Sequence, residues 1–201
     1  AFVTDMNQPL GDAVGTALEV KEAIEILHGK HLSDLRTVAV RLASQMLVLG
    51  GIIDTEEEAA AACEASLEEG TALGKLAAMI EAQGGEPRVT EDTALLPQAG
   101  RTVTVEAASS GWIGAIDAEA VGVAAMTLGA GRLTKEDSID PAVGIWMKKR
   151  LGERVTQGDP VAVFHANDES GLEDARAKFE GAITIAKEKP KPGKLVHAFV
   201  K

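Results

Sequence analysis

Apolar residues recur every three or four positions between residues 17 and 27, which is the spacing of one face of an α-helix. One predicted buried stripe consists of Val20, Ala23, Ile24 and Leu27. A second stripe lies on the opposite side of the same helix and consists of Gly15, Leu18 and Ile26. Glu22 falls in the middle of this second stripe. We therefore expect Glu22 to be a buried carboxylate, which requires a cation or hydrogen-bond donors.

Three more helices are predicted in the first hundred residues. Ser33 is a good N-cap for a helix that ends at Gly50, and the apolar face of this helix consists of Leu35, Val38, Leu42, Met46 and Leu49. Residues 55–58 read Thr-Glu-Glu-Glu, a capping box that opens a third helix. A fourth helix, stopped by Gly84, carries Leu73, Leu76, Ala77 and Ile80. Residues 84–100 contain two prolines and are typical of a connection between units.

The pattern changes from helical spacing to alternation after residue 100. Residues 101–117 alternate and contain a Ser-Ser-Gly turn at 109–111, which predicts a β-hairpin. Residues 151–166 predict a second hairpin that turns at Gly158 and Asp159.

Two helices and a polar loop are predicted between and after these strands. Residues 118–128 are helical in pattern, and residues 129–141 read as a polar loop. A last amphipathic helix is expected over residues 172–187. Its apolar face consists of Leu172, Ala175, Phe179, Ala182 and Ile183.

The chain opens on an apolar, strand-like run that closes on Asp5, followed by a turn through residues 7–11 and then a helix. We interpret residues 1–5 as a parallel strand. A parallel strand needs neighbours, so we expect this chain to be the second part of something larger.

Composition excludes several classes of function. The 201 residues are 45% apolar, and 20 basic against 31 acidic residues give a net charge of −11. This balance argues against a nucleic-acid or anionic-membrane partner. No run approaches the length of a membrane-spanning helix and no signal segment is recognisable, so we expect a soluble, cytoplasmic protein. Cys63 is the single cysteine, and we expect it to be a small buried residue.

Three short motifs have simple structural explanations. The run GAGR at residues 129–132 lacks the context of a phosphate loop and reads as a turn that caps the preceding helix. His28 and His31 have no third ligand nearby and read as solvated loop residues. The acidic stretch of residues 55–69 reads as a solvated helix surface.

Residues 151–164 resemble the closing hairpin of biotinyl and lipoyl carrier domains. In those carriers the modified lysine precedes the hairpin by half a domain, whereas Lys148 lies only four residues before Gly152. We expect the architecture to be shared and the swinging-arm chemistry to be absent.

These patterns together predict an α/β (α+β) fold. Residues 1–97 form a helical segment that completes a mixed α/β domain. Residues 98–201 form an α+β C-terminal domain with a barrel-sandwich, carrier-like hairpin pair.

Five segments in order resemble one family, the pyrimidine-nucleoside phosphorylases, which include thymidine phosphorylase. The segments are TDMNQPLG, GTALEVKEAIEIL, AQGG, LGAGRLTKEDSIDPAVG and LGERVTQGDPVAVFHA. The resemblance covers essentially the whole chain but only the later part of the family's chain. It implies that residues 1–97 finish the family's α/β glycosyltransferase domain and that residues 98–201 are its C-terminal domain. The opening strand would then belong to a sheet whose other strands come earlier in the family's chain.

The resemblance implies reversible phosphorolysis of a pyrimidine (deoxy)nucleoside to the free base and (deoxy)ribose 1-phosphate. Such a reaction requires cations and donors positioned around an oxocarbenium-like centre. Neither the family's KxSTGG-like phosphate loop nor its SGRGLGHTGGT-like segment occurs in this sequence. We therefore assign no catalytic residue and expect the isolated chain to be inactive.

The resemblance also implies a monovalent cation, K+, that supports the phosphate loop. Its ligands would be the backbone carbonyls of Leu10 and Ala13 and the carboxylate of Glu22. Hard oxygen ligands suit a hard cation. The alternative is a Glu22 that hydrogen-bonds to the turn or to the other half of the enzyme.

Three functions remain open from the sequence. The first is the C-terminal portion of a phosphorylase whose partner is the N-terminal half of the same enzyme, homodimeric when full length. The second is a non-catalytic, carrier-like binding or interaction module. The third is an AMP-phosphorylase-type nucleotide phosphorylase with the same fold.

Overall fold

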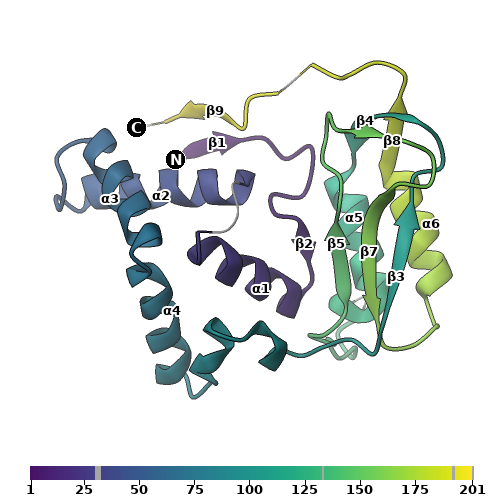
Figure 1. Cartoon of the computed structure of the whole chain (residues 1–201), viewed down its shortest axis with the longest axis horizontal. Helices are drawn as coiled ribbons and strands as arrows, with labels where there is room; N and C mark the ends of the chain where they lie inside the picture. The colour runs from purple at the N-terminus through teal and green to yellow at the C-terminus, as the bar shows by residue number, and fades with distance from the viewer. Residues whose placement is uncertain (30–32, 133, 192, 201) are drawn as a thin grey trace. The chain divides into compact units, whose positions relative to one another are not determined.

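A computed structural model describes residues 1–29, 33–132, 134–191 and 193–200 (Figure 1). Contacts divide the chain into two compact units. The first unit comprises Ala1–Val3, Lys21–Leu96 and Ala198–Lys201, and the second comprises Thr4–Val20 and Pro97–His197. The division after residue 97 that the sequence predicts would place residues 4–20 with the helices, whereas these contacts place them with the second unit.

The helices of the first half form where the apolar periodicity predicts them. They are α1 (Thr16–Leu27), α2 (Asp34–Leu49), α3 (Glu56–Glu68) and α4 (Thr71–Ala82), followed by the short 3₁₀ turns η1 (Pro87–Thr90) and η2 (Thr93–Leu95). The Ser33 hydroxyl accepts a hydrogen bond from the Arg36 amide at 3.3 Å, which confirms the predicted N-cap of α2. The Thr55 hydroxyl accepts from the Glu58 amide and donates to the Glu58 carboxylate, so α3 opens as predicted.

Burial on α1 agrees with one predicted stripe better than with the other. Leu18 and Ile26 are buried, and Glu22 between them is only 1% exposed, which confirms the prediction of a buried carboxylate. Ile24 is also buried, but Val20 is 37% exposed, so the prediction that Val20 is buried is wrong. Apolar spacing identifies a face but does not show how far along the helix that face is covered.

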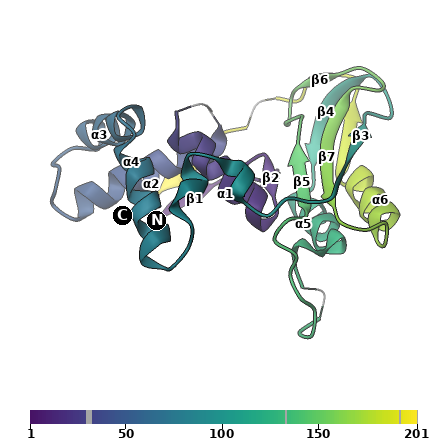
Figure 2. The same cartoon turned by 60° about the horizontal axis from the view of Figure 1, so that its bottom comes forward.

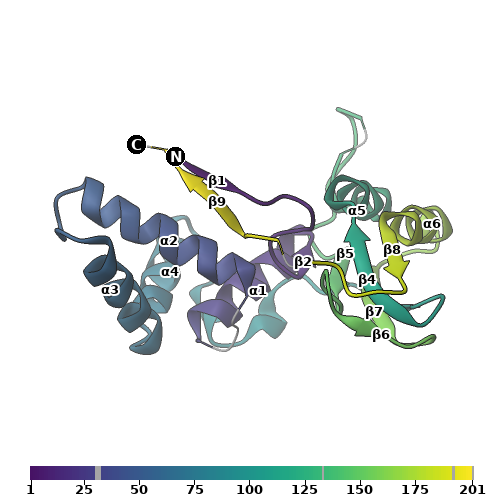
Figure 3. The same cartoon turned by 90° about the horizontal axis from the view of Figure 1, so that it is seen from above.

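The strand expected at the start of the chain is present as β1 (Phe2–Thr4), but its described partner was not predicted. β1 pairs with β9 (Val196–Phe199), and the two lie side by side in Figure 3. Ala1 and Val200 exchange both backbone hydrogen bonds, at 2.7 and 2.8 Å, which is the antiparallel pattern. The parallel neighbours that we expected are therefore not found among the described residues.

The second unit contains two antiparallel sheets. One has the strand order β2-β5-β7-β3 and consists of β2 (Ala13–Val14), β5 (Gly144–Met147), β7 (Pro160–Ala166) and β3 (Arg101–Glu106). The other has the order β6-β4-β8 and consists of β6 (Arg154–Val155), β4 (Gly111–Ile116) and β8 (Ile183–Ala186). Helices α5 (Ala118–Ala125) and α6 (Leu172–Ala182) lie side by side against the strands (Figures 2 and 3), and α5 continues into a π-helical turn, η3 (Met126–Ala130).

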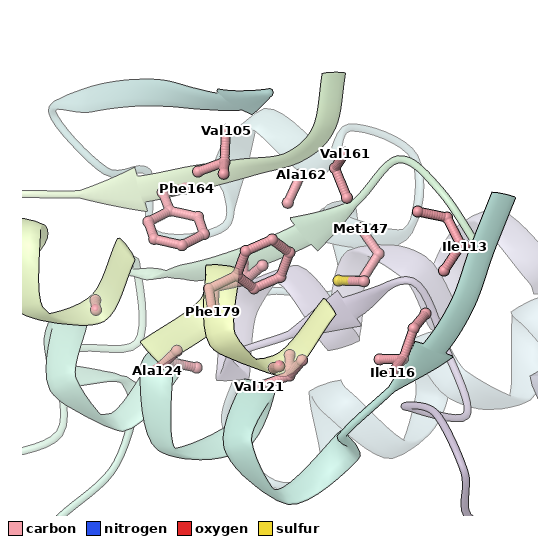
Figure 4. Packing of buried hydrophobic residues seen from close by; sticks show 14 of the residues in the cluster. Val105, Ile113, Ile116, Val121, Ala124, Met147, Val161, Ala162, Phe164 and Phe179 are labelled. Carbon is pink, nitrogen blue, oxygen red and sulfur yellow. The ribbon is translucent and has the colours of Figure 1, made fainter. Parts of the chain in front are cut away.

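The core of the second unit lies between the strands and these two helices (Figure 4). Phe164 on β7 and Phe179 on α6 are fully buried and meet edge to face, with ring centroids 5.4 Å apart. Ile113, Met147 and Val121 fill the space around them. Aromatic residues make up only 3% of the sequence, and this one buried pair with its aliphatic neighbours forms the centre of the core.

The strands of both expected hairpins are present, but the expected pairing within each hairpin is wrong. β3 pairs with β7 and β4 pairs with β6 and β8, so each predicted hairpin divides its two strands between the two sheets. The turn at Gly158 and Asp159 is confirmed, because the Asp159 amide donates to the Thr156 carbonyl at 2.9 Å. Alternation predicts a strand and its buried face, whereas it does not identify the partner strand.

The last helix is shorter than predicted. α6 ends at Ala182, and residues 183–186 form strand β8. Ile183 lies four positions after Phe179, so it fits the helical face by spacing, but it pairs with Ile116 of β4. Residues 183–186 also alternate, and the β-branched side chains of Ile183, Thr184 and Ile185 favour a strand.

Candidate functional site

The turn that precedes β2 is held by one arginine from a distant part of the sequence. Arg150 Nη1 donates to the Gly11 carbonyl at 2.8 Å, and Nη2 donates to the carbonyls of Pro9 at 2.7 Å and Leu10 at 3.2 Å. The carboxylate of Asp12 lies 3.5 Å from Nη1. All of these residues belong to the second unit.

Two further hydrogen bonds fix the ends of the same turn. The Gln8 side-chain carbonyl accepts from the Leu151 amide at 3.0 Å, and the Asp12 carbonyl accepts from the Met147 amide at 2.7 Å. Residues 8–12 are therefore attached at both ends and in the middle to the last residue of β5 and the segment that follows it.

The strand register orients the carbonyl group of Ala13. Ala13 lies opposite Trp146 and Val14 lies opposite Ile145. Bonded and non-bonded pairs alternate in an antiparallel ladder, and the pair next to Ala13, formed by Asp12 and Met147, is bonded. The Ala13 amide and carbonyl therefore face away from β5, toward the outer edge of β2, which is the last strand of its sheet.

Two glycines let the chain pass from β2 into α1. Gly15 has φ +137° and Gly144 has φ +155°, and their backbones touch. A Cβ at Gly15 would lie 2.5 Å from the Val143 carbonyl oxygen, and a Cβ at Gly144 would lie 2.3 Å from the Val14 carbonyl oxygen. Glycine is therefore required at both positions.

The three predicted cation ligands occupy different environments. Leu10 is 37% exposed and lies in the turn, and Ala13 is buried in β2 three residues later, so the structure places these two in one continuous segment of the second unit. Glu22 is buried on α1 and belongs to the first unit. No group of three or more His, Cys, Asp or Glu side chains among the described residues could hold a metal ion. A cation here would therefore need backbone carbonyl ligands.

A cleft of about 490 Å³ lies in the second unit beside the start of α1. Thr16, Glu19 and Val20 line one side, and Gly122, Met126 and Ala130 of α5 and η3 line the other. The Glu19 carboxylate accepts a hydrogen bond from the Gly15 amide at 3.0 Å. Among the described residues that line the cleft, Glu19 is the one charged side chain and none is cationic, whereas phosphorolysis requires cationic groups.

The motifs for which we expected structural roles have them where the structure describes them. Gly129 has φ +102° and ends the π turn, which confirms that GAGR is a turn at the end of a helix. His28 Nε2 lies 2.8 Å from the Thr90 carbonyl, so this histidine connects α1 to η1 and is not simply solvated. His31 lies outside the described residues. Cys63 is partly buried, with its sulfur 3.8 Å from the Ser44 hydroxyl.

Lys148 directly follows strand β5, and its backbone amide donates to the Val161 carbonyl at 2.7 Å. Its side-chain nitrogen lies 5.6 Å from the centre of the Trp146 ring. Its backbone is therefore tied to β7 and does not form the tip of a turn between strands, where a carrier lysine would be presented.

Sequence reasoning did not identify Arg150. The carrier-like pattern draws attention to Lys148, and nothing in the local sequence connects Arg150 to residues 9–12. The connection depends on the pairing of β2 with β5, which joins segments more than a hundred residues apart.

None of the helices among the described residues combines the length and apolar character needed to cross a membrane.

Comparison with known proteins agrees with the resemblance seen in the sequence. Residues 112–186 match the family described as the pyrimidine nucleoside phosphorylase C-terminal domain. The whole chain is 44% identical over 200 residues to a pyrimidine-nucleoside phosphorylase of Bacillus subtilis and 41% identical to one of Staphylococcus aureus. The chain spans 46% of the length of each relative. It therefore belongs to the pyrimidine-nucleoside phosphorylase family and corresponds to a C-terminal portion of it.

Proposed function

We propose that this chain serves pyrimidine-nucleoside phosphorolysis as the C-terminal portion of a pentosyltransferase. In this reaction phosphate attacks C1′ of a pyrimidine (deoxy)nucleoside and releases the base and (deoxy)ribose 1-phosphate. The observation that carries the proposal is the 41–44% identity to pyrimidine-nucleoside phosphorylases over the full length of the chain. The family resemblance further implies a cytoplasmic homodimer when the enzyme is complete.

The reacting groups are proposed to lie in the N-terminal half of the enzyme. Phosphorolysis must stabilise an anionic nucleophile and an anionic leaving base, which requires positioned cations and donors. The sequence lacks both of the family's phosphate- and base-binding segments, and the cleft beside α1 offers a carboxylate in place of a cationic group. The role proposed for this chain is to complete the fold and to support the site.

A potassium ion is the proposed support, held by the carbonyls of Leu10 and Ala13 and by the carboxylate of Glu22. The donor types fit, because all three are hard oxygen atoms. The Ala13 carbonyl faces the outer edge of its sheet, and Glu22 is a carboxylate at 1% exposure, which burial alone would disfavour. The bound cation would supply positive charge that orders the phosphate-binding loop of the other half.

An uncovered apolar groove in the first unit is the proposed contact for that N-terminal half. Leu42, Met46 and Leu49 of α2 are 46%, 71% and 78% exposed. Together with the ends of β1 and β9 they line a groove of about 590 Å³. Exposed apolar side chains in one contiguous patch indicate a surface that a partner covers. The relatives contain more than half of their length beyond what this chain matches, which is enough polypeptide to cover the groove.

Complementation tests the proposal. We expect the purified chain alone not to phosphorolyse thymidine or uridine. Co-expression with the N-terminal half of the Bacillus subtilis relative should produce a complex that releases free base in the presence of phosphate. Turnover by the isolated chain would contradict the placement of the chemistry, and a complex that forms without any turnover would contradict the enzymatic function.

A further inference from the structure

Arg150 gathers the carbonyl oxygens of three consecutive residues, Pro9, Leu10 and Gly11, around one guanidinium group. Its side chain is 21% exposed, and that of its ion-pair partner Asp12 is 19% exposed. Consecutive peptide units in a helix or strand do not direct their carbonyls to a single point. Carbonyl dipoles directed at one point repel one another, and the positive charge of Arg150 offsets this repulsion.

The three hydrogen bonds are not equal. Those to Pro9 and Gly11 are 2.7 and 2.8 Å long, whereas the one to Leu10 is 3.2 Å long. A carbonyl oxygen has two lone pairs, so the weaker interaction at Leu10 leaves acceptor capacity on the oxygen that the proposed function assigns to the cation. Pro9 and Gly11 hold the peptide on each side of Leu10 in place.

We infer that Arg150 is a positioning residue for the cation site, because it fixes the turn that presents the Leu10 carbonyl and leads into the Ala13 carbonyl. The inference rests on the proposed potassium site and adds to it a residue that does not touch the cation. Asp12 supports the same arrangement, since its carboxylate balances the charge of Arg150 and its carbonyl starts the pairing of β2 with β5.

The geometry depends on a guanidinium group and not only on a positive charge. Nη1 and Nη2 diverge in a fixed plane and reach carbonyls on both sides of Leu10. A lysine ammonium carries its donors on one nitrogen and lacks the fixed planar spacing of Nη1 and Nη2. Arg150→Lys therefore keeps the positive charge and removes the pair of diverging donors, Nη1 and Nη2.

The test uses the complex of this chain with the matching N-terminal half. Its melting temperature is measured against KCl concentration, with choline chloride keeping the ionic strength constant, because a ligand that binds the folded state raises its stability. We expect Arg150→Lys to raise the KCl concentration for half-maximal stabilisation about 10- to 100-fold, as substitution of groups behind metal ligands does. Hydrogen exchange without potassium should also become faster for the amides of residues 10–14.

Two controls separate positioning from general stability. Arg176→Lys makes the same chemical change in α6, where Arg176 pairs with Glu180 at 2.8 Å, and it should leave the potassium response unchanged. Ile113→Val removes a methylene group from the core of the second unit and should lower the melting temperature without changing the potassium concentration needed. If Arg150→Lys does not fold, Asp12→Asn should shift the potassium response in the same direction by a smaller factor.

The outcomes separate failure of the cation site from failure of the role of Arg150. A wild-type complex that potassium does not stabilise would overturn the cation site, and the role of Arg150 with it. A wild-type complex that responds to potassium, together with an Arg150→Lys complex of unchanged response, would overturn the role of Arg150 alone. Unchanged hydrogen exchange in residues 10–14 would likewise show that Arg150 does not hold the turn.

Discussion

At the scale of single residues, the contact between Gly15 and Gly144 sets how closely the turn, β5 and the start of α1 approach one another. A side chain at Gly144 would meet the Val14 carbonyl oxygen at 2.3 Å, and φ is +155° there. We expect Gly144→Ala to lower the free energy of unfolding by about 1–3 kcal/mol, because both the clash and the backbone conformation oppose a Cβ. Urea unfolding followed by circular dichroism measures this loss.

Gly122 provides the matched control for Gly144. It lies inside α5, and a Cβ added there meets nothing within 4 Å. Gly122→Ala should raise stability by about 0.5–1 kcal/mol, because alanine loses less conformational freedom in a helix than glycine does. Equal effects at the two positions would show that the close approach at Gly144 is not a constraint.

The burial of Glu22 is predicted by the sequence and found in the structure. The sequence predicts a carboxylate inside an apolar stripe, and the structure buries it to 1% exposure. In the complete enzyme we expect Glu22→Gln to raise the potassium concentration needed for activation by at least about tenfold, because a charged oxygen ligand is lost. Initial rates of thymidine phosphorolysis against KCl concentration measure the change.

Glu25→Gln changes a glutamate on the same helix that is only partly buried, and it should leave potassium activation unchanged. An unaltered potassium response in Glu22→Gln would remove Glu22 from the ligand set. Its burial would then be explained by hydrogen bonding to protein groups.

At the scale of helices and strands, local pattern predicts which elements form better than it predicts what they pair with. The caps at Ser33 and Thr55, the buried side of α1 around Glu22 and the face of α6 up to Ala182 could be predicted from the sequence, because they depend on neighbours within a few residues. The partner strands of β3 and β4 could not be predicted, because these two strands are consecutive in sequence but belong to different sheets. Arg150 escaped prediction for the same reason, because its carbonyl partners are distant in sequence.

The exposed face of α2 shows that apolar spacing does not identify what covers a helix face. The spacing of Leu42, Met46 and Leu49 predicts a covered helix face, and the described residues leave all three exposed. The pattern is explained if another polypeptide covers this face.

Substitution of Met46 tests whether the face of α2 docks the other half. Met46→Glu should abolish or strongly reduce complementation by the N-terminal half, because burying an unpaired carboxylate in an apolar contact is unfavourable. Met79 on α4 is 51% exposed and lies outside the groove, so Met79→Glu should complement like the wild type. Co-purification of the two halves and the thymidine phosphorolysis rate are the measurements. Normal complementation by Met46→Glu would remove α2 from the contact.

At the scale of the whole molecule, family membership and fold class follow from the chain, whereas the chemistry does not. The α/β class is confirmed, and the five ordered segments indicate the same family as the comparisons with known proteins. The proposed reaction needs cationic groups that this sequence does not supply in a recognisable segment. A domain can therefore be recognised by its packing residues even when the reacting residues lie elsewhere.

The pairing of β1 with β9 brings the first and last parts of the described chain within one hydrogen bond, since the Ala1 amine donates to the Val200 carbonyl at 2.7 Å. This pairing closes a loop of almost the full chain length, so it carries a large ordering entropy and gains nothing from proximity in sequence. Placing residue 1 directly after residue 200 in a rearranged polypeptide would convert this long-range pairing of described residues into a local hairpin. Such a rearrangement would shorten the loop that this pairing has to close and lower the contact order of the fold.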